Sequence, residues 1–154
     1  MDVPGENDCF PIDARPLLDR AVAAVAPFAL TRAVGIEVRQ PDLDSYVLAS
    51  PHHLQQAFEH VLSFLLGDAR KESTATVRVE ETAQWVTYSF ANTGCGLSDG
   101  RFRDYLFGEQ PPASEEFQNL RNVVRWVTGW GGTVEAGSSV GEGVFVTVSL
   151  PRFG

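Results

Sequence analysis

The residues of this 154-residue chain whose types and spacing could do chemistry gather in a short glycine-bearing segment. Asn92, Gly94, Gly96 and Leu97 follow an alternating apolar run, and glycines at this spacing allow tight turns and a close approach of the backbone to a ligand. His60 is a second candidate, because histidine can ligate a metal or carry a proton. On a mostly apolar helix, however, a lone histidine is typically a packed side chain, so we assign His60 no catalytic role.

Composition excludes several classes of protein. Twelve Lys and Arg against twenty Asp and Glu give a net charge of -8, and the basic residues form no run, which disfavours binding to a nucleic-acid backbone. Cys9 and Cys95 lie far apart without C-x-x-C spacing, so neither a disulfide framework nor a zinc site is predicted. The longest apolar stretches are far shorter than the roughly 20 residues of a membrane helix. The N-terminus is acidic and polar, unlike a secretory leader, so we expect a cytoplasmic chain without membrane contact.

The elements that must position these residues follow from hydrophobic periodicity. Helical spacing predicts three helices, around residues 16–28, 50–67 and 114–129, with Asp13 as a cap for the first and Gly129 as the stop of the last. The segment between the glycine loop and the third helix shows no regular pattern.

Alternation of apolar and polar residues predicts six strands in antiparallel pairs. The pairs are residues 34–39 with 45–49, 76–80 with 84–91, and 133–136 with 144–150. We expect the first pair to be a hairpin around a polar turn. Because each helix has one face to bury, the predicted fold is an α+β, two-layer α/β sandwich with a mixed, mostly antiparallel sheet and three helices on one face. Residues 1–9 are expected to form a tail and residues 10–152 a single domain.

Several local strings carry a family resemblance over nearly the whole chain. The strongest comprises Trp130, Gly131, Gly132, Thr133 and Val134, followed by Ser138, Gly141, Gly143, Val144, Phe145, Val146, Leu150 and Pro151. Residues 50–58 form a second string, and residues 10–13 look like a first strand. Together they resemble the ATP-binding catalytic domain of sensor histidine kinases, in the GHKL group of ATPases. The resemblance implies the Bergerat fold of that group.

The resemblance implies a magnesium site that this sequence does not reproduce. In the family the second helix carries two Asn four residues apart on one face, and the second ligates the magnesium that bridges the ATP phosphates. In the preferred register these positions fall on His60 and Phe64. A phenyl ring offers no lone pair to a hard cation that requires oxygen ligands. A register shifted by one helical turn places them on Phe64 and Asp68 instead, and it requires an extra turn elsewhere.

The family's first glycine box matches in part. Its two glycines correspond to Gly94 and Gly96, and Asn92 stands where the family has an Asp that accepts a hydrogen bond from the adenine amino group. A neutral amide replaces that carboxylate only partly. The retained glycines have an architectural explanation as readily as a functional one.

The family's second glycine box, which supplies backbone N–H groups for the phosphates, corresponds to residues 115–120. Only Leu120 matches there. Glu115 and Glu116 add repulsion toward phosphate, and they suit the first turn of a helix instead. The segment after Leu97 is too short for a long ATP lid.

These departures predict a degenerate ATPase-like domain without productive binding of ATP or magnesium. We expect it to act by protein contact in two-component signalling, on a dimerisation and phosphotransfer domain or a response regulator, with no catalytic residue, metal or cofactor. Core filling of the former pocket is predicted for Phe64, Phe117 and Trp126. The vestigial nucleotide pocket is predicted at His60, Phe64, Asn92, Gly94, Gly96, Leu97 and Leu120.

Two alternatives stay open. One is a nucleotide-binding enzyme that uses Asn92, Gly94 and Gly96 to hold ATP, with or without magnesium, in an atypical mode and phosphorylates a histidine on another domain. The other is a scaffold that binds a different small ligand in the same pocket. Without dimerisation helices in the sequence, a monomer is expected.

Overall fold

The computed structural model describes residue 5 and residues 8–41, 46–112 and 114–153 of the chain. The elements in chain order are β1 (Phe10–Asp13), α1 (Arg15–Arg32), β2 (Gly35–Arg39), β3 (Tyr46–Ala49), α2 (Pro51–Asp68), β4 (Thr74–Glu81), β5 (Trp85–Ala91), α3 (Asp99–Phe107), α4 (Glu115–Gly129), β6 (Thr133–Ser139) and β7 (Gly143–Pro151).

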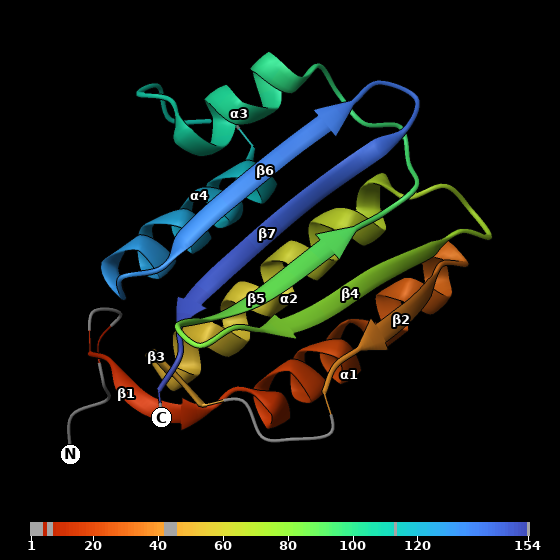
Figure 1. Ribbon diagram of the computed structural model, residues 1–154. Coiled ribbons are helices and arrows are strands. Elements are labelled where there is room, and N and C mark those ends of the chain that lie inside the picture. The colour runs from red at the N-terminus through yellow and green to blue at the C-terminus, as the bar shows by residue number, and fades with distance from the viewer. Residues whose placement is uncertain (1–4, 6–7, 42–45, 113, 154) are drawn as a thin grey trace.

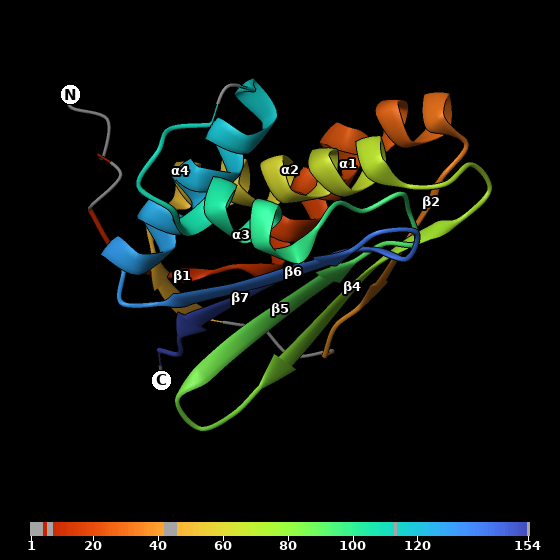
Figure 2. The same cartoon turned by 90° about the horizontal axis from the view of Figure 1, so that it is seen from above.

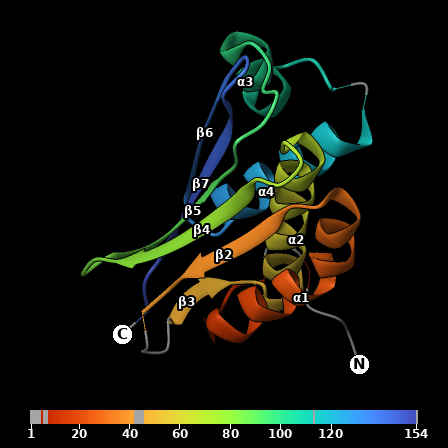
Figure 3. The ribbon, with the colours of Figure 1, turned by 90° about the vertical axis from the view of Figure 1, so that its right-hand side faces the viewer.

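The described elements form two layers. Five strands make a mixed sheet in the order β2-β4-β5-β7-β6, and β1 pairs with β3 in a small separate sheet (Figure 1). The helices cover one face of the large sheet and leave the other face open (Figure 2). Helices α1, α2 and α4 lie side by side in the helical layer (Figure 3). The α+β, two-layer architecture expected from the sequence is therefore confirmed.

The core lies between the sheet and α2, the central helix of the layer. Along β4 and β5 every second side chain points to the helices and is buried, which is the period of a strand with one face in the core. Helix α2 buries residues on most of its turns because α1 and α4 flank it on both sides. Both strand pairs predicted for the second half of the chain, β4 with β5 and β6 with β7, are antiparallel as expected.

The hairpin predicted between residues 34–39 and 45–49 is wrong. β2 pairs in parallel with β4, with Gly35 opposite Thr74, and β3 pairs with β1. Residues 42–45, which include the expected turn, lie outside the described residues. The inward side chains of β3, Val47 and Ala49, are fully buried, and β3 lies against β1 and β7. The chain passes through β3 and α2 between β2 and β4, and a long crossover of this kind permits the parallel pairing of β2 with β4.

The described residues contain four helices, one more than predicted. The additional helix, α3, is short, and it buries only Phe102 and Leu106. This single i, i+4 pair lies among charged residues, so the periodicity along the chain is too weak to reveal a helix. The predicted cap at Asp13 is one residue early, since Ala14 is the N-cap and Asp13 Oδ1 accepts from Arg15 N at 3.1 Å.

Among the described residues, no helix combines the length and apolar character that a membrane span requires.

Tyr88 on β5 leads to a prediction about stability. Its side chain is 1% exposed, and within the described chain its hydroxyl has no hydrogen-bond partner. Burial, followed by the nearby charges of Glu81 and Asp13, raises the pKa of Tyr88. A buried hydroxyl without a partner costs free energy, so Tyr88→Phe is expected to leave the free energy of unfolding unchanged or to raise it by about 1 kcal/mol.

Urea denaturation of Tyr88→Phe tests this expectation. Tyr88→Leu is the control, because it removes the ring that packs against Phe58 at 4.9 Å between centroids and should cost about 3 kcal/mol. A loss of more than about 1 kcal/mol in Tyr88→Phe would mean that the hydroxyl has a stabilising partner.

Candidate functional site

The glycine-bearing segment after β5 is joined to the end of α2. The Asp68 carboxylate accepts hydrogen bonds from Gly96 N, at 3.0 Å to Oδ1, and from Asn92 Nδ2, at 3.1 Å to Oδ2. Ala69 and Gly94 form an isolated antiparallel bridge next to these contacts. The C-terminal turn of α2 and this segment therefore behave as one packed unit.

The Asn92 side chain lies at the centre of this unit. Its Nδ2 donates to Leu65 O at 2.8 Å as well as to Asp68, and its Oδ1 accepts from Val144 N at 2.8 Å. A side-chain amide has two N–H donors, and both are used here within the protein. Asn92 thus connects α2 to the first residues of β7.

Most backbone donors of the segment are also used within the protein. Of the six N–H groups at residues 92–97, all but that of Thr93 bond to α2 or to the β6–β7 hairpin. The bonds run from Asn92 N to Val144 O, Gly94 N to Glu142 O and Cys95 N to Asp68 O, each at 3.1 Å, and from Leu97 N to Ser138 Oγ at 2.8 Å. With the bond from Gly96 to Asp68, five N–H groups of the segment are satisfied internally.

Close packing accounts for both glycines. A Cβ atom at Gly94 would lie 2.4 Å from Asp68 O, and one at Gly96 would lie 2.2 Å from Ser139 O. Gly96 also has a φ of 64°, in the left-handed region that favours glycine. Because backbone atoms cannot retreat as a flexible side chain can, these positions exclude a side chain without reference to any ligand.

An aromatic cluster fills the space between α2, α3 and α4. The ring of Phe64 lies 5.7 Å from that of Phe102 and 5.2 Å from that of Phe117, measured between centroids. Tyr105 adds a contact to Phe117 at 4.3 Å. Phe64 is buried and Phe117 is partly buried against the core, which matches the core-filling role expected for both. Trp126 is also buried, and its ring packs beside those of His53 and His60.

The start of α4 carries negative charge and holds α3 in place. Ser114 Oγ accepts from Phe117 N at 3.2 Å as the N-cap, and exposed Glu115 and Glu116 form the first turn. One turn later, Arg121 Nε donates to Tyr105 O at 3.1 Å, and its Nη2 donates to the carbonyl oxygens of Asp104 and Gly108 at the end of α3. The guanidinium thus satisfies acceptors that a helix C-terminus leaves open.

His60 occupies a separate place on α2. Its ring stacks on that of Trp126 at 6.0 Å, and it is half-buried beside a cavity of about 370 Å³ between α1, α2 and α4. Burial lowers the pKa of His60, and the charge of Glu59 opposes this shift in part. We find no group of three His, Cys, Asp or Glu side chains in the described chain that could hold a metal ion.

The residues predicted for the pocket therefore divide into separate groups. Asn92, Gly94, Gly96 and Leu97 lie together. Their partner on α2 is Asp68, which the shifted register named and the preferred register did not. His60 and Phe64 pack elsewhere on α2, and Leu120 is buried core. The shifted register was the signal for Asp68, whereas nothing local pointed to Arg121.

The contact between Asp68 and Asn92 predicts the effect of a single substitution. Asn92→Asp would place a carboxylate against Leu65 O and the Asp68 carboxylate, so the free energy of unfolding should fall by about 2–4 kcal/mol at pH 7. Two neighbouring carboxylates raise the pKa of one of them in the folded state, so the loss should be smaller at pH 4 than at pH 7.

The reciprocal double variant Asp68→Asn/Asn92→Asp is the matched control. Its amide at position 68 could again donate to a carboxylate at position 92, so urea denaturation should give a loss smaller than the sum of the two single variants. Strict additivity would show that the two side chains do not interact.

The lowered pKa of His60 predicts that the stability of the fold depends on pH. Its folded-state pKa lies below the ordinary value of 6.5, so the unfolded chain binds the proton more strongly and stability should fall as the pH drops below that value. His60→Gln should remove this component, giving a flatter stability profile from pH 7 to pH 5 in thermal unfolding. An equal slope in both proteins would contradict the prediction.

The chain is similar to known proteins in its structure. No family model and no curated protein matches the sequence. Among solved structures, the mycobacterial sensor histidine kinase MprB matches with a TM-score of 0.74 and 16% identity over 94% of this chain and 97% of that one. The nucleotide-free catalytic domain of histidine kinase ThkA has a TM-score of 0.78 and 11% identity, with 94% and 97% covered. Full-length ShkA, solved in complex with AMPPNP, matches with a TM-score of 0.75 and 20% identity over 94% of this chain and 31% of ShkA. The chain therefore has the fold of histidine kinase catalytic domains.

Proposed function

We propose that this chain is an ATPase-like domain of the histidine-kinase type that has lost productive binding of ATP and magnesium and acts by protein contact in two-component signalling. The observation that carries the proposal is that the side-chain amide of Asn92 uses all of its hydrogen-bonding groups within the protein. Both of its donors and its carbonyl oxygen are bonded to α2 and β7. In the related kinases this position carries the carboxylate that accepts the adenine amino group.

The backbone around Asn92 supports the same conclusion. Five N–H groups of the segment donate within the protein, so an arriving base would have to break bonds that stabilise the end of α2. Breaking such bonds leaves buried groups unsatisfied, at a cost of about 1–3 kcal/mol each. The glycines that resemble a nucleotide box are explained by packing against Asp68 and Ser139.

The residues present do not fit magnesium or a triphosphate. Phe64, at one of the two positions that the resemblance assigns to Asn, packs between Phe102 and Phe117 and supplies no oxygen. In the shifted register the second position is Asp68, whose two carboxylate oxygens already accept from Gly96 N and Asn92 Nδ2. Glu115 and Glu116 lie in the first turn of α4. The resemblance assigns these positions to the phosphate-binding box. Two carboxylates there repel phosphate instead of binding it.

Loss of nucleotide binding leaves the surface of the domain as its means of action. The partner we propose is a dimerisation and phosphotransfer domain or a response regulator of a two-component pathway, in the cytoplasm. This chain would then influence phosphotransfer that another protein carries out.

Isothermal titration with AMPPNP, ATP and ADP, with and without magnesium, tests the proposal. We expect no heat and no shift in melting temperature up to millimolar nucleotide. ShkA, whose structure was solved with AMPPNP, is the positive control. Phe64→Asn should not restore binding, because Asn92 remains committed.

Micromolar, magnesium-dependent binding by the unmutated chain would overturn the proposal and support the nucleotide-binding alternative. Binding of nucleotide by Phe64→Asn alone would show that the aromatic cluster, and not Asn92, is the obstacle.

A further inference from the structure

The solvent side of α1 is apolar. Its exposed positions between Arg20 and Thr31 carry no charged residue, and Phe28 is 41% and Leu30 83% exposed. A helix that packs on a core normally presents polar and charged side chains to water. Large apolar side chains exposed on a helix without charged neighbours mark a surface that another molecule can cover.

A cavity of about 370 Å³ lies beside this surface, between α1, α2 and α4. These three helices are neighbours in the helical layer (Figures 2 and 3). The apolar lining is Ala24, Val25 and Phe28 of α1 and Phe64 of α2, and the lining carboxylates are Glu59 of α2 and Glu116 of α4. The polar side chains of His60, Ser63 and Asn119 complete the lining. We call this cavity with its lining residues the acidic groove.

The carboxylates of the acidic groove are not neutralised by the protein itself. Across the described ranges, neither Glu59 nor Glu116 has an ion pair or a hydrogen bond, and no Lys or Arg lines the cavity. The chain as a whole has a net charge of -8. Apolar side chains of α1 with unpaired negative charge beside them are complementary to an amphipathic segment that carries basic residues.

We propose that the acidic groove is the docking site for an amphipathic helix of a protein partner, with apolar side chains against α1 and Arg or Lys against Glu59 and Glu116. The proposal rests on the function by protein contact proposed above, and it names the chemistry of the partner. A second copy of this chain is the less favoured occupant, because two surfaces of the same sign repel each other.

Three synthetic helical peptides of about 16 residues test the proposal. They share one leucine face and carry Arg, Gln or Glu at the flanking positions. Titration followed by amide chemical shifts should show the Arg peptide binding about tenfold more tightly than the Gln peptide, and the Glu peptide most weakly. The shifts should map to Ala24, Phe28 and Ser63.

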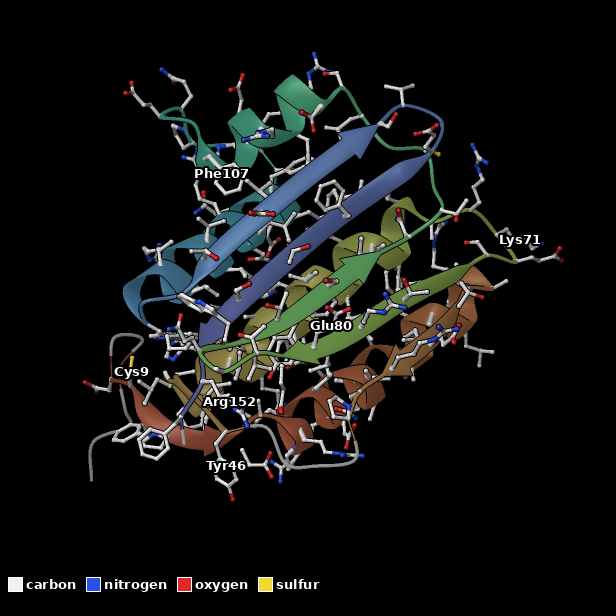
Figure 4. The ribbon with its side chains drawn as sticks, in the orientation of Figure 1. Cys9, Tyr46, Lys71, Glu80, Phe107 and Arg152 are labelled. Carbon is white, nitrogen blue, oxygen red and sulfur yellow. The ribbon has the colours of Figure 1, made fainter. Side chains whose placement is uncertain are left out.

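A matched pair of double variants separates the groove from general attraction to an acidic protein. Glu59→Gln/Glu116→Gln should abolish the preference for Arg. Glu80→Gln/Glu135→Gln removes the same charge from the open face of the sheet, where Glu80 is visible in Figure 4, and should retain the preference. Ala24→Lys, at an exposed position of α1, should weaken binding of the Arg peptide by supplying a cation to the groove.

Equal affinity for the three peptides would overturn the proposal, as would shifts that map outside the groove or a preference lost equally in both double variants. Concentration-dependent dimerisation through α1 in analytical ultracentrifugation would assign the surface to a second copy instead. The nucleotide titration is independent of these outcomes. Binding of AMPPNP would overturn the proposed function, whereas failure of the peptides alone would overturn only the groove.

Discussion

The hydrogen bonds between Asp68 at the end of α2 and the segment after β5 are the interaction on which this end of the molecule depends. Asp68 accepts from Asn92 and Gly96, and Asn92 continues the connection to Val144 at the start of β7. A helix end, a loop and a hairpin are thereby joined through one carboxylate and one amide. Because the donors and acceptors are matched, the loop needs no ligand to be ordered, and its glycines are required by the distance between backbones.

The aromatic cluster is the second constraint on the same region. Phe64, Phe102 and Phe117 come from three different helices, so their packing fixes where α3 and α4 lie relative to α2. Arg121 adds polar bonds to the end of α3, which has few apolar residues of its own. In a binding domain, the corresponding space would have to open to admit a ligand. Here, opening it would expose buried rings and separate three helices.

The outer surface of the helical layer carries both acidic and apolar side chains. The side chains that line the cavity beside His60 include Glu59 and Glu116, together with Phe28 of α1, which is 41% exposed. Apolar area gives affinity and charge gives selectivity between partners. A domain that retains its scaffold but has its loop donors committed internally can thus still recognise another protein through its helices.

The sequence by itself determined the elements whose pattern is local. The alternation in residues 76–80 and 84–91, the C-terminal hairpin and the stripe of α2 each bury one face, and that face is visible as a period along the chain. Tertiary structure alone decided that β2 pairs in parallel with β4, that α3 is helical, and that Asp68 is the residue of α2 that meets Asn92. These features depend on groups distant in sequence. A strand takes the neighbour that completes its hydrogen bonds, a short helix forms where Arg121 and the aromatic rings hold it, and one further helical turn determines which side chain reaches the loop.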